Sequence, residues 1–163
     1  MDVLALAPIT ACLTKVTLAA GTTTTLSTTG TTTYAIRGKA YTKAALSNAA
    51  TPTTDAITGA AFVGVVANKG CVYLVGFNAA GTLLAAQGSI TDLDTSGNFK
   101  QAPQLPSGLP LDFCPIGYLV IKAGSTANAT TGWIFGTSNM SSVTGITYTF
   151  GDLATLTDRP LIS

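Results

Sequence analysis

The residues whose types and spacing come closest to a metal site occupy positions 92–98, with the sequence DLDTSGN. Oxygen-bearing side chains alternate along this stretch and glycine stands at its sixth position, as at the start of an EF-hand calcium loop. The match then fails, because Lys100 is at the ninth position and Pro103 stands where a bidentate glutamate belongs. Aspartate, serine, glycine and asparagine also suit polar turns. We expect a turn between two strands, with weak calcium binding as the alternative, and assign no metal ligands.

Acid–base and nucleophilic chemistry have few candidate residues. The chain contains no histidine and no glutamate, and histidine is the side chain that most readily moves protons near neutral pH. It contains no G-x-S-x-G elbow, Walker loop or dinucleotide fingerprint. A Ser–Lys dyad is not excluded by spacing, but nothing singles out a pair. We therefore predict that the protein is not an enzyme and needs no cofactor.

The aromatic residues suggest one binding alternative. The single tryptophan, Trp133, together with Tyr34, Tyr41 or Tyr73, would be able to stack against a sugar ring. Trp133 also opens a short apolar run, which favours a place in the core. A carbohydrate-binding β-sandwich thus stays open, with core burial of Trp133 as the simpler interpretation.

Charge is scarce in this sequence. Charged residues make up 9% of the chain, the net charge is +1 and the mean hydropathy is +0.44. Arg37, Lys39 and Lys43 are the nearest approach to a basic cluster, too few for a polyanion partner, so we expect no nucleic-acid binding. A surface this poor in charge is either covered by hydroxyl groups or buried in an oligomer or lattice. We favour self-association.

The cysteines and the apolar runs indicate the redox compartment and whether the chain crosses a membrane. Cys12, Cys71 and Cys114 are isolated and odd in number, which predicts free buried thiols and assembly in a reducing cytoplasm. Apolar runs such as residues 60–67 are too short to cross a bilayer, so no membrane partner is expected. Residues 9–12 look like the end of a lipoprotein signal, but Asp2 stands where basic residues belong.

The remaining patterns predict an all-β protein. Residues 1–20 form an apolar N-terminal arm before a β domain at 21–163, and the arm should be held against its own domain or a neighbouring subunit. Turn residues at 78–81 join two apolar runs into a β-hairpin, and four prolines make 103–115 an irregular connection. Further strands are predicted at 22–33 (an edge strand interrupted at Gly30), 34–41, 61–67, 116–122, 133–136 and 143–150. Such short strands indicate an antiparallel sandwich or barrel, jelly-roll-like in outline.

Several phrases together resemble small virion proteins of tailed bacteriophages that decorate or cement the capsid. They are YAIRGKAYT (34–42), NAAG (78–81) followed by AQGS (86–89), DFCPIGYLVIK (112–122), FGTSN (135–139), and TYTFGDL (147–153) with DRP (158–160).

The resemblance implies a structural protein on the capsid exterior, assembled in the host cytoplasm. It implies a homo-oligomer, a trimer by preference, that binds the major capsid protein and stabilises the assembled shell. Under this hypothesis the apolar side chains of Val3, Leu4, Leu6 and Ile9 contact a neighbour or the capsid. A tail component (tube, fibre or baseplate) has the same composition and remains an alternative.

Overall fold

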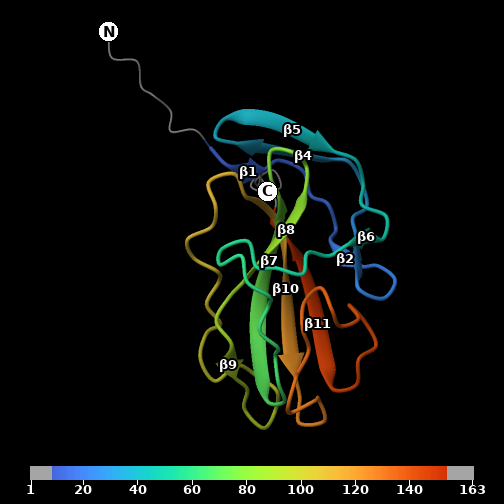
Figure 1. Cartoon of the computed structure of the whole chain (residues 1–163), viewed down its shortest axis with the longest axis vertical. Coiled ribbons are helices and arrows are strands. Elements are labelled where there is room, and N and C mark those ends of the chain that lie inside the picture. The colour runs from blue at the N-terminus through green and yellow to red at the C-terminus, as the bar shows by residue number, and fades with distance from the viewer. Residues whose placement is uncertain (1–8, 154–163) are drawn as a thin grey trace, which may run out of the picture.

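The computed structural model describes residues 9–153, in which every strand pairing is antiparallel and no helix occurs. The predicted all-β class is confirmed, and the three sheets pack together without closing into a barrel (Figure 1). The strands are β1 (Ala11–Cys12), β2 (Ala19–Ala20), β3 (Thr25–Ser27), β4 (Thr32–Ile36), β5 (Lys39–Lys43), β6 (Ala49–Ala50), β7 (Lys69–Phe77), β8 (Leu83–Gln87), β9 (Thr91–Asp92), β10 (Cys114–Ala123) and β11 (Ile146–Asp152).

The largest sheet has the order β11-β10-β7-β8, with β9 also paired to β7. Its long strands run side by side along the long axis of the molecule (Figure 1). The hairpin of β7 and β8 confirms the prediction for residues 71–90. Asn78 holds its turn by accepting hydrogen bonds at Oδ1 from the amides of Ala80 and Thr82, and Gly81 adopts a positive φ of 73°. Strands β10 and β11 confirm the predictions at 116–122 and 143–150, with shifted bounds.

One face of this sheet forms the main core. Alternate residues of β7 and β10, such as Tyr73 and Leu119, point into it and are fully buried. The irregular segments around Phe62 and Phe135 cover that face, together with Leu26 from the small sheet β2-β3-β6. A second cluster packs under the sheet β1-β4-β5 and includes Tyr34, Phe77 and Ile116.

Residues 9–20, which the sequence analysis placed in the arm, are packed into the folded body. Strand β1 pairs with β4, β2 pairs with β3, and Cys12, Val16 and Leu18 are buried. The amide of Leu18 donates to the carboxylate of Asp152 at 2.9 Å, which ties this segment to the end of β11. Deleting residues 1–20 would therefore remove core side chains as well as the arm.

Two predictions near the N-terminus are wrong in detail. Residues 34–41 form a hairpin of β4 and β5 and not a single strand, because Arg37 and Gly38 both adopt positive φ (52° and 78°) and reverse the chain. The break at Gly30 is present, but β3 lies between β2 and β6, and β4 between β1 and β5. Neither of the strands in the threonine-rich stretch is at an edge.

Two predicted strands, 61–67 and 133–136, are irregular instead. A single bridge between Val65 and Trp133 is their only ladder contact with each other. Both segments use their apolar side chains to cover the core face of the large sheet, and burial of this kind does not require a strand. The predicted C-terminal tail at 158–163 lies outside the described residues.

Candidate functional site

Residues 92–98 form the polar turn expected from their composition. The carboxylate of Asp94 accepts hydrogen bonds from the amides of Ser96 (2.9 Å) and Asn98 (2.8 Å), and Gly97 supplies a positive φ of 78°. These bonds lower the pKa of Asp94, with that from Asn98 contributing most. Among the described residues, no cluster of three potential metal-binding side chains occurs. One carboxylate oxygen of Asp94, Oδ1, thus accepts both hydrogen bonds from the backbone of the turn.

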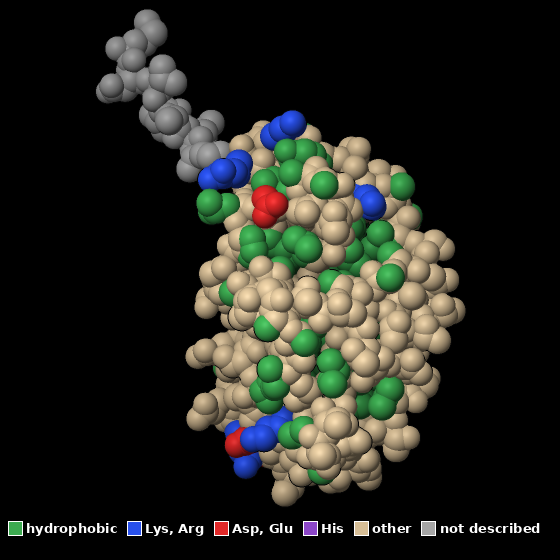
Figure 2. All heavy atoms as spheres, viewed as in Figure 1, with side chains coloured by type: hydrophobic (Ala, Val, Ile, Leu, Met, Phe, Trp, Pro, Cys, Tyr) green, Lys and Arg blue, Asp and Glu red, His purple; other side chains and the backbone are tan. Residues whose placement is uncertain are grey.

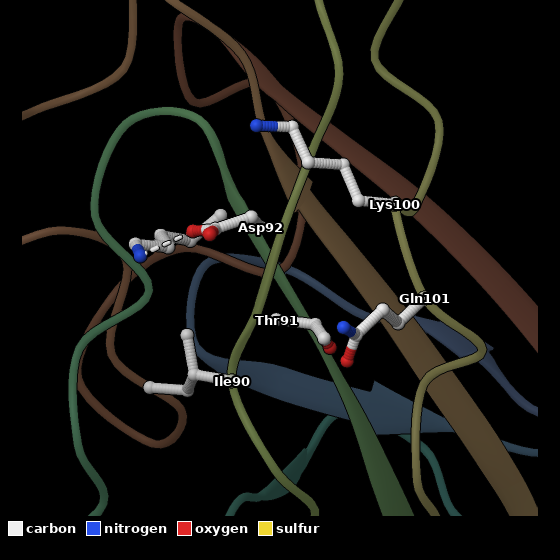
Figure 3. Close-up of a pocket in the computed structure, with 6 residues that line it drawn as sticks. Ile90, Thr91, Asp92, Lys100 and Gln101 are labelled. Atoms are coloured by element: carbon white, nitrogen blue, oxygen red, sulfur yellow. Dashed lines mark hydrogen bonds and ion pairs between the residues drawn. The ribbon is translucent and has the colours of Figure 1, made fainter.

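A polar hollow of about 300 Å³ adjoins this turn (Figure 3). It is lined by Lys69, Ile90, Thr91, Asp92, Lys100 and Gln101. Asp92 forms an ion pair with Lys69, which lowers the pKa of the carboxyl group, first by a hydrogen bond and then by charge. Lys122 lies close by, with its Nζ 5.2 Å from the centre of the Phe99 ring. The hollow is open to solvent and its acidic group is already neutralised, so it offers at most a weak contact to an anion.

The aromatic side chains proposed to bind sugar are mostly in the core. Trp133 is 1% exposed and packs edge-on against Tyr73, Phe135 and Tyr148, with ring centroids 5.8–6.0 Å apart. Tyr34 and Tyr73 are buried as well. The stacking platform around Trp133 is therefore wrong, because a buried indole presents no face to a ligand.

The three cysteines are free and buried, as predicted. Burial raises the pKa of the Cys71 thiol to about 11 and that of Cys114 to about 12. The pKa of Cys12 is raised too, again mainly because burial removes water from the thiol. Thiols that stay protonated near neutral pH are poor nucleophiles, so these residues act as small apolar core groups.

The basic trio lies on the β4–β5 hairpin at one end of the molecule. Arg37 and Lys39 are exposed, and the Nζ of Lys39 lies 5.4 Å from the centre of the Tyr41 ring. Of the four side chains predicted to bind a partner, Val3, Leu4 and Leu6 lie outside the described residues. Ile9 is 61% exposed beside this same hairpin, with its carbonyl accepting from the Gly38 amide at 2.9 Å.

An apolar groove crosses the outer face of the large sheet, opposite the main core. Its floor consists of β7 and β10 side chains and its walls come from the proline-rich connection and the residue after β11: Val72, Leu74, Pro103, Leu105, Tyr118, Val120 and Leu153. The groove encloses about 290 Å³, and Leu105 at its rim is 56% exposed. Sequence reasoning missed it, although the unbroken apolar run in β7 indicated that both faces of that strand would be covered.

Charged side chains gather at the two ends of the long axis (Figure 2). One group belongs to the β4–β5 hairpin, and the other comprises Lys69, Asp92 and Lys100 around the hollow. Residues 70–91 and 123–151 contain no charge at all, and these stretches supply most of β7, β8 and β11. The flank of the molecule that Figure 2 shows is therefore uncharged between the two ends.

No described helix is long and apolar enough to span a membrane. Comparisons of this chain with family models, curated proteins and solved structures produce no match.

Proposed function

We propose that this protein is a structural virion component that binds the assembled capsid of a tailed phage and stabilises it. It decorates the exterior of the shell, associates with copies of itself and contacts the major capsid protein through its N-terminal arm or surface loops. It has no catalytic role and requires no cofactor.

The observation that carries the proposal is the uncharged flank. Surfaces that become buried between proteins are depleted in charge at their centres, whereas a soluble monomer keeps charge distributed over its surface. On the face shown in Figure 2, charged side chains lie near the two ends, while hydroxyl and apolar side chains occupy the flank between them. Such a flank suits close lateral contact in a lattice.

The positions of the sequence segments that resemble phage virion proteins support the proposal. Residues 34–42 form the β4–β5 hairpin, residues 78–81 are the turn of the β7–β8 hairpin, and residues 112–122 and 147–153 contain most of β10 and β11. These phrases are strands and turns and not a ligand site, which agrees with a structural role.

The test is a binding experiment with purified protein and two forms of the capsid subunit. We expect the protein to co-sediment to saturation with assembled shells and not to bind unassembled subunits. Binding only to the assembled state should raise the temperature at which shells dissociate, because a ligand present at 100 times its Kd stabilises its site by about 2.7 kcal/mol. Failure to bind shells would overturn the proposal.

A further inference from the structure

Edge strands expose unpaired backbone groups, and proteins normally protect them with charge, shortness or a covering segment. Strands β1, β2, β6 and β9 have two residues each. Strand β5 carries Lys39 and Lys43. The edge of β8 is covered, since its Ala85 carbonyl accepts from the Ala56 amide and the Gln87 side chain bonds both backbone groups of Val63.

Strand β11 has none of these protections among the described residues. It is seven residues long, its sequence is ITYTFGD, and it carries no proline and no charge before its last residue. Its residues are half-buried or exposed, and it lies at the outer side of the sheet (Figure 1). It is therefore the one long, uncharged and uncovered sheet edge that the described part of the chain presents.

The register identifies the backbone groups that are free. The Gly145 carbonyl accepts from Gly124 and the Leu153 amide donates to Ile116, so odd-numbered residues face β10. In an antiparallel ladder the direction alternates, which turns the N–H and C=O groups of Tyr148 and Phe150 outward. Between residues 9 and 153 no hydrogen-bond partner for these outward groups occurs.

We propose that β11 is a self-association edge, which pairs antiparallel with β11 of a second copy and joins two large sheets into one. The pairing is two-fold, so each strand presents the same donors and acceptors to the other.

The partner that best suits the uncharged edge of β11 is β11 of a second copy. An uncharged edge pairs most favourably with another uncharged edge, because a lysine-bearing strand would lose hydration of its charge. The other described edges are short, lysine-bearing or covered, which leaves β11 itself. Pairing centred on Thr149 also places favourable side chains opposite one another: Thr149 faces Thr149 of the second copy on the exposed face, and Tyr148 faces Phe150 on the core face.

The inference concerns the protein alone and holds whether or not it binds a shell. It predicts a two-fold dimer in solution, in contrast to the trimer implied by the phage resemblance. Because the experiment contains no particles, its failure is distinguishable from failure of the proposed function.

The experiment measures the mass of the full chain in solution by sedimentation velocity over a range of concentrations. Wild type should be dimeric. In the Thr149→Lys variant the two new lysines, one from each copy, would lie opposite each other at the centre of the pairing. Their repulsion should raise the dimer Kd by about tenfold or more. Thr42→Lys is the matched control, because Thr42 is an exposed threonine on a strand that already carries lysines, and it should remain a dimer.

A charge swap tests the pairing directly. Thr149→Lys and Thr149→Asp should each be monomeric alone, and an equimolar mixture should dimerise, because opposite charges then face each other. Circular dichroism of each variant reports folding separately. A wild-type trimer, a monomer at every concentration, an unaffected Thr149→Lys dimer or a mixture without rescue would each overturn the inference.

Hydrogen exchange of the wild type needs no variant. The amides of Tyr148 and Phe150 should exchange faster on dilution below the dimer Kd, while those of Thr147 and Thr149, bonded to β10, should not change. Slow exchange of Tyr148 and Phe150 in a monomer would show that the chain's own terminal residues cover the edge, and would contradict pairing between copies.

Discussion

At the scale of single residues, Trp133, which the sequence offered as a candidate for stacking against a sugar, is instead a central side chain of the core. Its ring contacts Tyr73 from the large sheet, Phe135 from the covering segment and Tyr148 from β11. Its Nε1 donates to the Asn139 carbonyl at 2.8 Å, which satisfies the polar end of the indole. The side chain thereby joins its own covering segment to β7 and β11 of the large sheet.

Replacing Trp133 tests this role. Trp133→Ala should lower the free energy of unfolding by about 3–5 kcal/mol, because it leaves a large cavity between the sheet and its cover. Urea unfolding monitored by circular dichroism measures the loss, with Trp133→Phe as the milder control. In wild type the fluorescence of this single tryptophan should be blue-shifted and unresponsive to glycans. A loss below about 1 kcal/mol would contradict core burial.

The buried thiols predict a pH dependence. The pKa of Cys71 rises from an ordinary value of 9.0 to about 11 in the folded state, so the unfolded chain ionises first. Cys71 therefore contributes stability that is fully present below pH 9 and is lost as the pH rises from about 9 towards 11. Urea unfolding at a series of alkaline pH values should show this decline. The decline in unfolding free energy between about pH 9 and pH 11 should be smaller in Cys71→Ala, when each protein is compared with its own stability at neutral pH.

At the scale of elements, periodicity predicted the strands that pair along their length. The alternation in 143–150 and the apolar runs around 71–77 and 116–122 predicted β11, β7 and β10, and asparagine and glycine located the turn between β7 and β8. These elements follow from local patterns, because side-chain alternation and turn chemistry are both short-range properties.

Periodicity failed where apolar residues cover a sheet without joining it. Segments 61–67 and 133–136 are as apolar as a strand, yet each makes only isolated bridges. Glycines let the two segments approach each other closely: a Cβ at Gly64 would lie 2.0 Å from the Thr131 carbonyl oxygen, and one at Gly132 would lie 2.5 Å from the Val65 carbonyl. Contacts of this kind depend on the tertiary structure and leave no periodic signal.

Gly132→Ala tests this close approach. Gly132 has a φ of 67°, and an added Cβ would collide with the backbone of Val65 and Val66. The substitution should cost more than about 1 kcal/mol of unfolding free energy and expose Trp133 to quenching by acrylamide. Gly97→Ala is the control, because Gly97 also has a positive φ (78°) but has open space around it. Equal losses in the two variants would contradict the packing described between 64–66 and 131–133.

At the scale of the whole molecule, the sequence predicted a charge-poor, self-associating protein without indicating which surface associates. Low charge is a property of composition, but the separation of charges to the two ends depends on the fold. Of the predicted partner residues, Ile9 alone lies within the described residues, and its side chain is exposed. The β11 edge and the outer groove emerge only when strands from distant parts of the chain are placed side by side.

The arm is tested by deleting residues 1–8, which leaves β1 and the buried Cys12, Val16 and Leu18 in place. The truncated protein should fold normally and bind shells at least about tenfold more weakly, since each leucine buried at a contact contributes about 1.5–3 kcal/mol. Co-sedimentation with shells measures the effect. A Leu4→Asp, Leu6→Asp variant of the full chain should lose binding in the same way, which separates the loss of apolar side chains from the shortening of the chain. Unchanged binding by both would contradict a role for the arm.

The most direct test of the proposed function is quantitative mass spectrometry of purified phage particles, with copies counted against the major capsid protein. Our account predicts a simple stoichiometric ratio to the capsid subunit, as expected for a protein that covers the shell. A far lower copy number would place the protein in the tail or at a vertex. Its absence from purified particles would contradict the virion role.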